Sequence, residues 1–296
     1  MGLRIYREPD ISKPDLIAAW PGIGNIGLIA VDTLRRAVEA EPFAEIEPWH
    51  FFYPNGITVQ NGELIDMGFP RSRFFYKKLG TKDLIFFVGE EQPSGGKKGY
   101  EMVDLVLNLA STFRCQRVYT AAAAVTTIHH SVKPKVWAVP NTKTLIQEVK
   151  QYPNSVLMSD VAGRIGEGNI SGLNGLLLGA AGKRDLPGIC LLGEIPVYVS
   201  QFLTPYPKAS RSIIEVLENN LGISPDLSKL DEMDREVDQN IERLYTMIPQ
   251  EMRDQIDHLQ YVEQPEAEST GKITEEDKKD IMQHIEEFFK KGGQED

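Results

Sequence analysis

The sequence predicts an α/β fold in which a mixed, mostly parallel sheet lies between two layers of helices. Short apolar runs alternate with helical repeats along residues 15–196, and several runs are apolar at every position, as strands covered on both faces should be. Glycine-rich stretches follow some of these runs and place turns at the carboxyl ends of the strands, where α/β proteins bind ligands. We expect a three-layer α/β/α body over residues 1–225.

The elements follow from the spacing of apolar residues. Residues 15–20 form an apolar run between Pro14 and Pro21, which is typical of an interior strand. Within residues 45–66 the period changes to two, and Asn61-Gly62 indicates a type I′ hairpin, because both turn residues need positive φ. The remaining strands are expected at 73–77, 83–89, 116–123, 135–139 and 188–193, and helices at 25–40, 99–113, 142–149 and 171–181.

Charge is distributed unevenly along the chain. Residues 226–296 hold 21 acidic and 9 basic side chains, a net charge of −12, whereas the whole chain carries −11, so the body is close to neutral. A neutral body lacks the clustered Lys and Arg of a nucleic-acid surface. No apolar run reaches the roughly 20 residues that span a bilayer, and the N-terminus lacks a signal-peptide core. We therefore expect a cytoplasmic protein that binds neither nucleic acid nor membrane.

The sequence offers no pattern for a metal or a catalytic nucleophile. Cys115 and Cys190 lie singly in apolar segments, which indicates buried thiols. His129 and His130 are adjacent, so they cannot easily reach one ligand, and no third metal-type residue accompanies them. The G-x-S-x-G elbow of serine hydrolases is absent from the sequence. We expect no cofactor, no metal and no catalytic residue, and an enzyme is not favoured.

Glycine-rich turns define a candidate ligand rim. Gly22, Gly24 and Gly27 satisfy G-x-G-x-x-G, and free amides at a helix start can hold an anion. A dinucleotide site also needs an acidic residue at the end of the second strand, but Glu45 and Glu47 lie within that strand. Packing of a tight turn is favoured over nucleotide binding, and a phosphate-bearing ligand stays open. The rim candidates are Gly22, Gly24, Asn25, Gly27, Glu90, Glu91, Asn169, Asn174 and Glu194.

The polar rim residues allow two interpretations. Glu90, Glu91 and Glu194 stand at expected strand ends, where converging carboxylates act as acid and base if burial raises one pKa. The favoured interpretation is structural: the carboxylates cap helix amides or pair with an arginine such as Arg71, Arg73 or Arg164. Asn169 and Asn174 flank a helix start, where Asn is an ordinary cap and turn residue.

The acidic extension predicts amphipathic helices over residues 226–261, a linker at 262–271 and a short terminal helix within 272–296. The first segment either folds onto its own body or is presented to a partner groove or sister subunit, and the linker favours a mobile or partner-bound state for the last helix. The candidates for partner contact are Leu230, Val237, Ile241, Leu244, Ile248, Ile281, Ile285 and Phe288.

Several motifs recur together in one order over residues 1 to about 245. They are the glycine-rich stretch from Trp20 to Asp32, the strand segment Pro42–Ile46, the hairpin turn Asn61-Gly62, the segment Gly89–Pro93, and the glycine-containing segments Gly168–Gly179 and Gly188–Pro196. This combination resembles the proteasome assembly chaperone family, named after the second eukaryotic chaperone. The resemblance implies an α/β/α fold similar to nucleoside phosphorylases, self-association with a trimer favoured, and a chaperone-like role toward proteasome subunits.

Two functions therefore compete. One is a non-catalytic, homo-oligomeric assembly chaperone that binds a protein client. A proteasome-binding tail in this family is expected to end in a hydrophobic residue, a tyrosine and one more, whereas this sequence ends Gly292-Gly293-Gln294-Glu295-Asp296, which argues against direct docking into the proteasome pocket. The alternative is an enzyme or sensor that holds a phosphorylated or nucleoside-like molecule at the rim. The ATP-grasp-like carboligase label given to archaeal members belongs to this alternative and has no support in the sequence.

Overall fold

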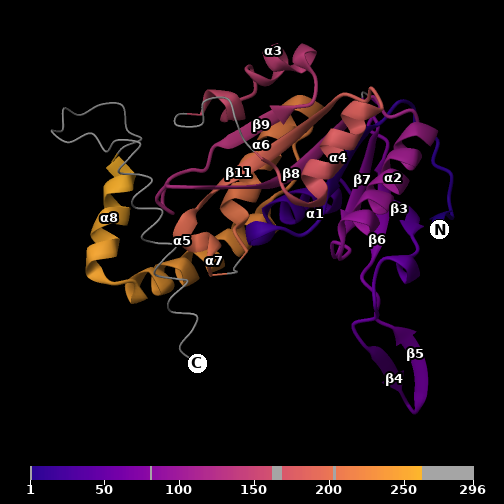
Figure 1. Cartoon of the computed structure of the whole chain (residues 1–296), viewed down its shortest axis with the longest axis horizontal. Coiled ribbons are helices and arrows are strands. Elements are labelled where there is room, and N and C mark those ends of the chain that lie inside the picture. The colour runs from indigo at the N-terminus through magenta and orange to yellow at the C-terminus, as the bar shows by residue number, and fades with distance from the viewer. Residues whose placement is uncertain (1, 81, 162–168, 203–204, 262–296) are drawn as a thin grey trace.

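A nine-stranded sheet runs through the body of the computed structural model, which describes residues 2–80, 82–161, 169–202 and 205–261 (Figure 1). Its strands are β1 (Leu3–Ile5), β2 (Asp15–Ala19), β3 (Glu41–Ile46), β6 (Ser72–Lys77), β7 (Leu84–Gly89), β8 (Arg117–Thr126), β9 (Val136–Pro140), β10 (Ser155–Leu157) and β11 (Gly188–Pro196). They lie in the order β1-β3-β6-β7-β2-β8-β11-β9-β10.

The four central strands β7, β2, β8 and β11 are parallel. β6, β3 and β1 extend one side of this group in antiparallel pairings, and β9 pairs antiparallel with β11 on the other side, with β10 parallel to β9 at the edge. Every residue of β2 is buried, which explains why its sequence is apolar almost throughout. The predicted α/β fold with a large mixed sheet is confirmed.

Helices cover both faces of the sheet (Figure 1). They are α1 (Ile26–Ala37), α2 (Gly96–Thr112), α3 (Ile146–Val149), α4 (Gly172–Lys183), α5 (Val197–Ser200), α6 (Pro207–Leu221), α7 (Ser228–Met247) and α8 (Gln250–Tyr261). Alternate residues of β2 point to opposite layers: Ile17 packs in a core with α1 and α6, and Leu16 packs in a core with α2 and α4. This alternation follows from the period of two along a strand and produces the three layers.

Several elements differ from the sequence-based expectation, among them the short elements β1, β10 and α5, which it did not include. The helix expected over residues 142–149 is a 3₁₀ turn, Lys143–Leu145, followed by the single turn α3. The strand expected over residues 188–193 is longer, because β11 continues to Pro196 between β8 and β9, with nine buried residues. Helix α6 had not been expected as an element, and it packs across α1.

The hairpin predicted at Asn61-Gly62 is confirmed, but it stands apart from the main sheet. Its strands β4 (Ile57–Gln60) and β5 (Glu63–Met67) pair only with each other, and Figure 1 shows the hairpin projecting away from the body. Asn61 and Gly62 have φ values of 52° and 83°. These positive angles are those that a two-residue type I′ turn requires.

The acidic extension begins with α7, which packs against α6. Leu230, Val237 and Ile241 of α7 and Ile248 after it are buried in the same core as α1 and α6, and Leu244 is half-buried. The structure therefore has this segment folded onto its own body, the first of the two accounts above. The linker 262–271 and the segment 272–296, with Ile281, Ile285 and Phe288, lie outside the described residues.

None of the helices in the described ranges combines the length and the apolar character that crossing a bilayer would need.

Candidate functional site

A cavity of about 260 Å³ lies at the carboxyl ends of β2 and β8, where the sequence placed the rim. Four of the nine rim candidates line it: Gly22, Gly27, Asn169 and Asn174. The structure describes the segment Gly168–Gly179 from residue 169 onward. The remaining candidates Gly24, Asn25, Glu90, Glu91 and Glu194 are not among the lining residues. The structure thus brings part of the predicted rim together.

Close packing accounts for two of the three fingerprint glycines. A Cβ at Gly27 would lie 2.0 Å from the carbonyl oxygen of Ala121, because α1 crosses β8 at this point. Gly24 has a φ of 59°, and a Cβ there would lie 3.0 Å from Ile195 Cδ1. Only Gly22 has open space beside it. The favoured interpretation, a tight turn packed on the sheet, agrees with this geometry.

Two amide side chains clamp this turn to α4. The Asn174 Oδ1 atom accepts a hydrogen bond from the Trp20 backbone nitrogen at 3.2 Å, and Asn174 is buried. Gln92 Nε2 donates to the Pro21 carbonyl at 2.6 Å, and Gln92 Oε1 accepts from the Leu173 nitrogen at 3.1 Å. Gln92 thereby satisfies one of the unpaired amides at the start of α4. The sequence analysis did not identify Gln92 as a capping residue, although Gln92 lies in the segment Gly89–Pro93 named above. It expected a cap from Asn174 instead.

The three candidate carboxylates have different hydrogen-bond partners. The buried Glu194 accepts hydrogen bonds from Trp137 Nε1 and from the Lys135 backbone nitrogen, both at 2.8 Å. Glu90 accepts from the Arg71 nitrogen at 2.9 Å, and its other oxygen lies 3.7 Å from Arg73 Nη2.

Glu91, the next residue along the chain, has a different partner and accepts from Asn55 Nδ2 at 3.0 Å. Each of the three carboxylates therefore holds nearby backbone or side-chain donors. This bonding agrees with the structural interpretation of the three residues.

A buried histidine pair joins the body to the extension. The rings of His129 and His130, which follow β8, lie side by side with centroids 4.1 Å apart. His130 Nε2 lies 2.9 Å from Glu242 of α7, and its Nδ1 lies 2.7 Å from the Tyr198 hydroxyl. Burial and the neighbouring His130 lower the pKa of His129 to about 4. These contacts make the pair a polar joint that positions α7.

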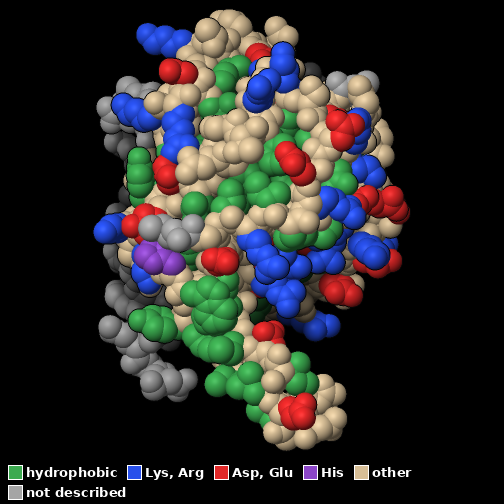
Figure 2. All heavy atoms as spheres, turned by 90° about the vertical axis from the view of Figure 1, so that its right-hand side faces the viewer, with side chains coloured by type: hydrophobic (Ala, Val, Ile, Leu, Met, Phe, Trp, Pro, Cys, Tyr) green, Lys and Arg blue, Asp and Glu red, His purple; other side chains and the backbone are tan. Residues whose placement is uncertain are grey.

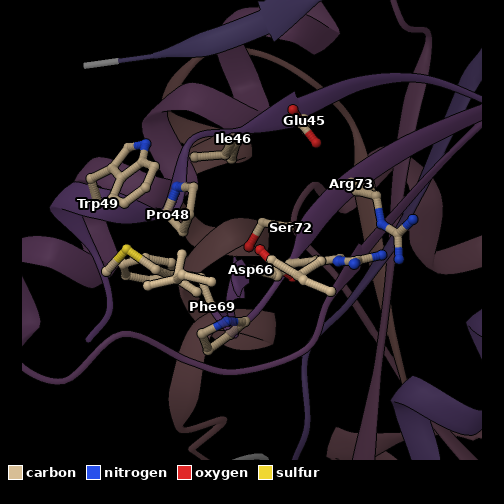
Figure 3. A pocket seen from close by; sticks show the side chains of 13 residues that line it. Glu45, Ile46, Pro48, Trp49, Asp66, Phe69, Ser72 and Arg73 are labelled. Atoms are coloured by element: carbon tan, nitrogen blue, oxygen red, sulfur yellow. The ribbon is translucent and has the colours of Figure 1, made fainter. Parts of the chain in front are cut away.

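A second cavity, of about 420 Å³, opens at the root of the hairpin and was not expected from the sequence. In Figure 3, Trp49 and Phe69 stand on one side of it, Arg73 stands on the other, and Asp66 and Ser72 lie between them. The rings of Trp49 and Phe69 pack with centroids 4.6 Å apart, although the Trp49 residue is 65% exposed. An exposed aromatic beside charged groups is typical of protein-binding surfaces.

The chain is similar to archaeal and bacterial proteins of known structure. The structure matches PbaB of Pyrococcus furiosus, described as an archaeal proteasome activator, with a TM-score of 0.70 and 25% identity over 82% of this chain and 98% of that one. PbaA of the same organism, described as an archaeal homolog of proteasome-assembly chaperone, has a TM-score of 0.61 at 19% identity, with 87% and 98% covered. A PAC2 family protein from Streptomyces avermitilis has a TM-score of 0.64 at 20% identity, with 78% and 95% covered.

Sequence comparison points to the same group. Over 230 residues the chain is 26% identical to the uncharacterized protein MJ1210 of Methanocaldococcus jannaschii. This alignment covers 77% of this chain and 82% of that protein. The pattern of the PAC2 family matches residues 16–245, which include the sheet apart from β1 and the first residue of β2, the helices α1 to α6 and most of α7. The chain therefore belongs to the PAC2 family.

Proposed function

We propose that the protein is a non-catalytic, self-associating cytoplasmic chaperone that binds a protein client and helps a proteasome-type or other complex to assemble. The observation that carries this proposal is the similarity to PbaB, the archaeal proteasome activator, at 25% identity over 98% of that chain. Membership of the PAC2 family and the similar fold of PbaA, a homolog of proteasome-assembly chaperone, point the same way.

The chemistry of the rim favours protein binding over catalysis. Asn174 and Glu194 use their polar atoms to hold the turn at Trp20 and Lys135, the residue before β9. The rim cavity, at about 260 Å³, lies below the roughly 300–1,000 Å³ that pockets for small ligands usually enclose. Exposed apolar side chains gather instead around the hairpin, where Figure 2 shows them. A surface of that kind suits a polypeptide partner.

We place the client contact at the end of the extension, within residues 272–296. Val237 and Ile241 are buried against the body, so the inner face of α7 is occupied. Leu244 on α7 is half-buried, and the remaining apolar candidates, Ile281, Ile285 and Phe288, recur at helical spacing in the sequence. A short amphipathic helix of this kind binds a groove on its partner.

Truncation after residue 261 tests this assignment. The shortened chain keeps Ile241 and Ile256 in the core, so its melting temperature should stay close to that of the full chain. We expect capture of purified proteasome subunits from the source organism by the full chain and at least about tenfold weaker capture by the shortened one. Undiminished capture would remove the tail from the mechanism, and a full chain that retains no proteasome subunit would contradict the proteasome role.

Point variants give the matched control in the full chain. Ile281→Asp places a charge at an expected contact position and should weaken capture, whereas Gln283→Asp adds the same charge at a polar position and should not. Equal capture by the two variants would show that the apolar stripe is not the contact.

The rim cavity supports one alternative, a sensor or enzyme for a phosphorylated or nucleoside-like molecule. Gly22 and Asn169 line this cavity at the strand ends, where α/β folds bind ligands. A thermal-shift panel of nucleotides, inorganic phosphate and ribosides decides between the two. A ligand at 100 times its Kd would add about 2.7 kcal/mol to the free energy of unfolding. We expect no shift across the panel, and a clear shift would favour the alternative.

A further inference from the structure

The hairpin β4–β5 has one apolar face and one polar face. Residues that lie directly opposite each other on paired strands project from the same side of the sheet. The register places Ile57 opposite Met67 and Val59 opposite Leu64 on the apolar face, and Thr58 opposite Asp66 and Gln60 opposite Glu63 on the polar face. A bulge between Thr58 and Val59 keeps Val59 and Leu64 in register with the apolar pair below them.

No part of the described chain covers the apolar face. Its four side chains remain between 36% and 61% exposed. Figure 2 shows hydrophobic side chains at the surface of the projecting hairpin. A two-stranded hairpin alone is at best marginally stable in water and normally needs further strands or a packed face. The hairpin therefore has the residue pattern of a sheet with one buried face, but no element of the described chain packs on that face.

The apolar surface continues onto the body at the root of the hairpin. Trp49 is 65% exposed and lines the same cavity as Leu64 and Met67. We call the four apolar hairpin residues together with Trp49 the apolar strip. With these exposed fractions the strip leaves on the order of 600 Å² in water, the upper end of the roughly 300–600 Å² of the largest patch on a typical monomer.

We propose that a second copy of this chain covers the apolar strip, in a two-fold contact in which two hairpins pack apolar face to apolar face and point in opposite directions. This proposal rests on the self-association proposed above and assigns it a surface. Two strips packed together remove on the order of 1,200 Å² from water, the lower bound of standard interfaces. A two-fold contact gives an even number of subunits, either a dimer or a larger assembly such as two joined trimers.

Charge agrees with this arrangement. Residues 53–69 contain Glu63 and Asp66 but no Lys or Arg. Glu63 lies on the polar face near the tip, and Asp66 lines the cavity at the root beside Trp49. Opposed hairpins bring the acidic tip at Glu63 toward the root of the other copy, where Arg71 and Arg73 line the cavity. Figure 2 shows basic side chains beside the root of the hairpin. The strip itself carries no charge with which to select a foreign partner.

Charge substitutions test the contact. Val59→Glu and Leu64→Glu put carboxylates on the apolar face, and Thr58→Glu puts the same group on the exposed polar face as the matched control. All three side chains are exposed, so none of the changes disturbs the core. In sedimentation velocity over a range of concentrations, we expect at least about 100-fold weaker self-association for the first two variants and no more than a few-fold change for the control.

Cysteine crosslinking tests the two-fold geometry. A residue near the axis meets its own copy, so Ile57→Cys or Val59→Cys should form an intersubunit disulfide on mild oxidation, whereas Thr58→Cys should not. The natural thiols of Cys115 and Cys190 do not compete, because both are buried and burial raises the pKa of each to about 12.

Each outcome decides the proposal. Dissociation by the two apolar-face variants alone, with self-crosslinking, is the expected result. Unchanged oligomers in the Glu variants would overturn the hairpin contact and leave self-association to another surface. Dissociation without self-crosslinking would show that the strip packs on a different surface, which overturns the face-to-face pair. A wild-type chain that is monomeric at every concentration would overturn both the contact and the proposed self-association, while client capture would still be tested separately.

Discussion

Replacing Ile241 by Ala tests whether the extension is part of the folded body. Ile241 is fully buried on α7, within the core that includes α1 and α6. Truncation of a buried Ile to Ala removes its transfer free energy and leaves a cavity, with a usual loss of about 2–5 kcal/mol, so we expect a loss of about 3 kcal/mol. For a domain of this size that corresponds to a fall in Tm of about 6–12 °C.

The measurement is urea unfolding followed by circular dichroism, with thermal melts in parallel. Asn240→Ala changes the neighbouring residue on the exposed side of α7 and should stay within about 0.5 kcal/mol of the wild type. If Ile241→Ala also stayed within that range, α7 would not be packed as described. Two separate transitions in the wild type would equally contradict a single cooperative unit.

Two further predictions concern the rim turn and the histidine joint. Gly27→Ala should lower the free energy of unfolding by about 3 kcal/mol, because its Cβ would lie 2.0 Å from the Ala121 oxygen, whereas Gly22→Ala has open space and should be nearly neutral in the same denaturation experiment. The pKa of His129 is about 4 in the folded state, below its value of about 6.5 in the unfolded chain. The contribution of His129 to the free energy of unfolding is therefore complete above about pH 6.5. It is lost as the pH falls toward 4, because the unfolded chain binds the proton more tightly than the folded one. Between pH 7 and 5 the wild type should lose about 2 kcal/mol more than His129→Gln, and parallel pH profiles would contradict the assignment.

The parallel centre of the fold could be predicted because strands buried on both faces are apolar at nearly every position. β2 and β7 are such strands, and both lie where the sequence placed them. The hairpin turn was equally predictable, since Asn61-Gly62 favours positive φ. The projection of the hairpin away from the main sheet was not predictable. The alternation of apolar and polar residues in its strands is the same whether another strand or solvent lies beside them.

The candidate site was less predictable than the fold. The sequence ends the last strand at Gly193, but β11 continues to Pro196, so Glu194 lies within the sheet. Its side chain accepts a hydrogen bond from Trp137 and does not line the rim cavity, a direction that depends on the pleat. Gln92 was missed because its role depends on the first amides of α4, which lie 81 residues further along the chain. α6 carries Ile213 and Leu217 at helical spacing, so its sequence did hold the signal for a helix.

The position of β11 has a consequence for biosynthesis. This strand is inserted between β8 and β9, although it follows both of them in the chain. Until residue 196 has left the ribosome, β9 can pair only with β10, and one edge of β8 is unpaired. Such long-range pairing slows folding and leaves a strand edge open to other chains. The nascent chain should therefore depend on protection by cellular chaperones for longer than a protein of the same size whose sheet forms in sequence order.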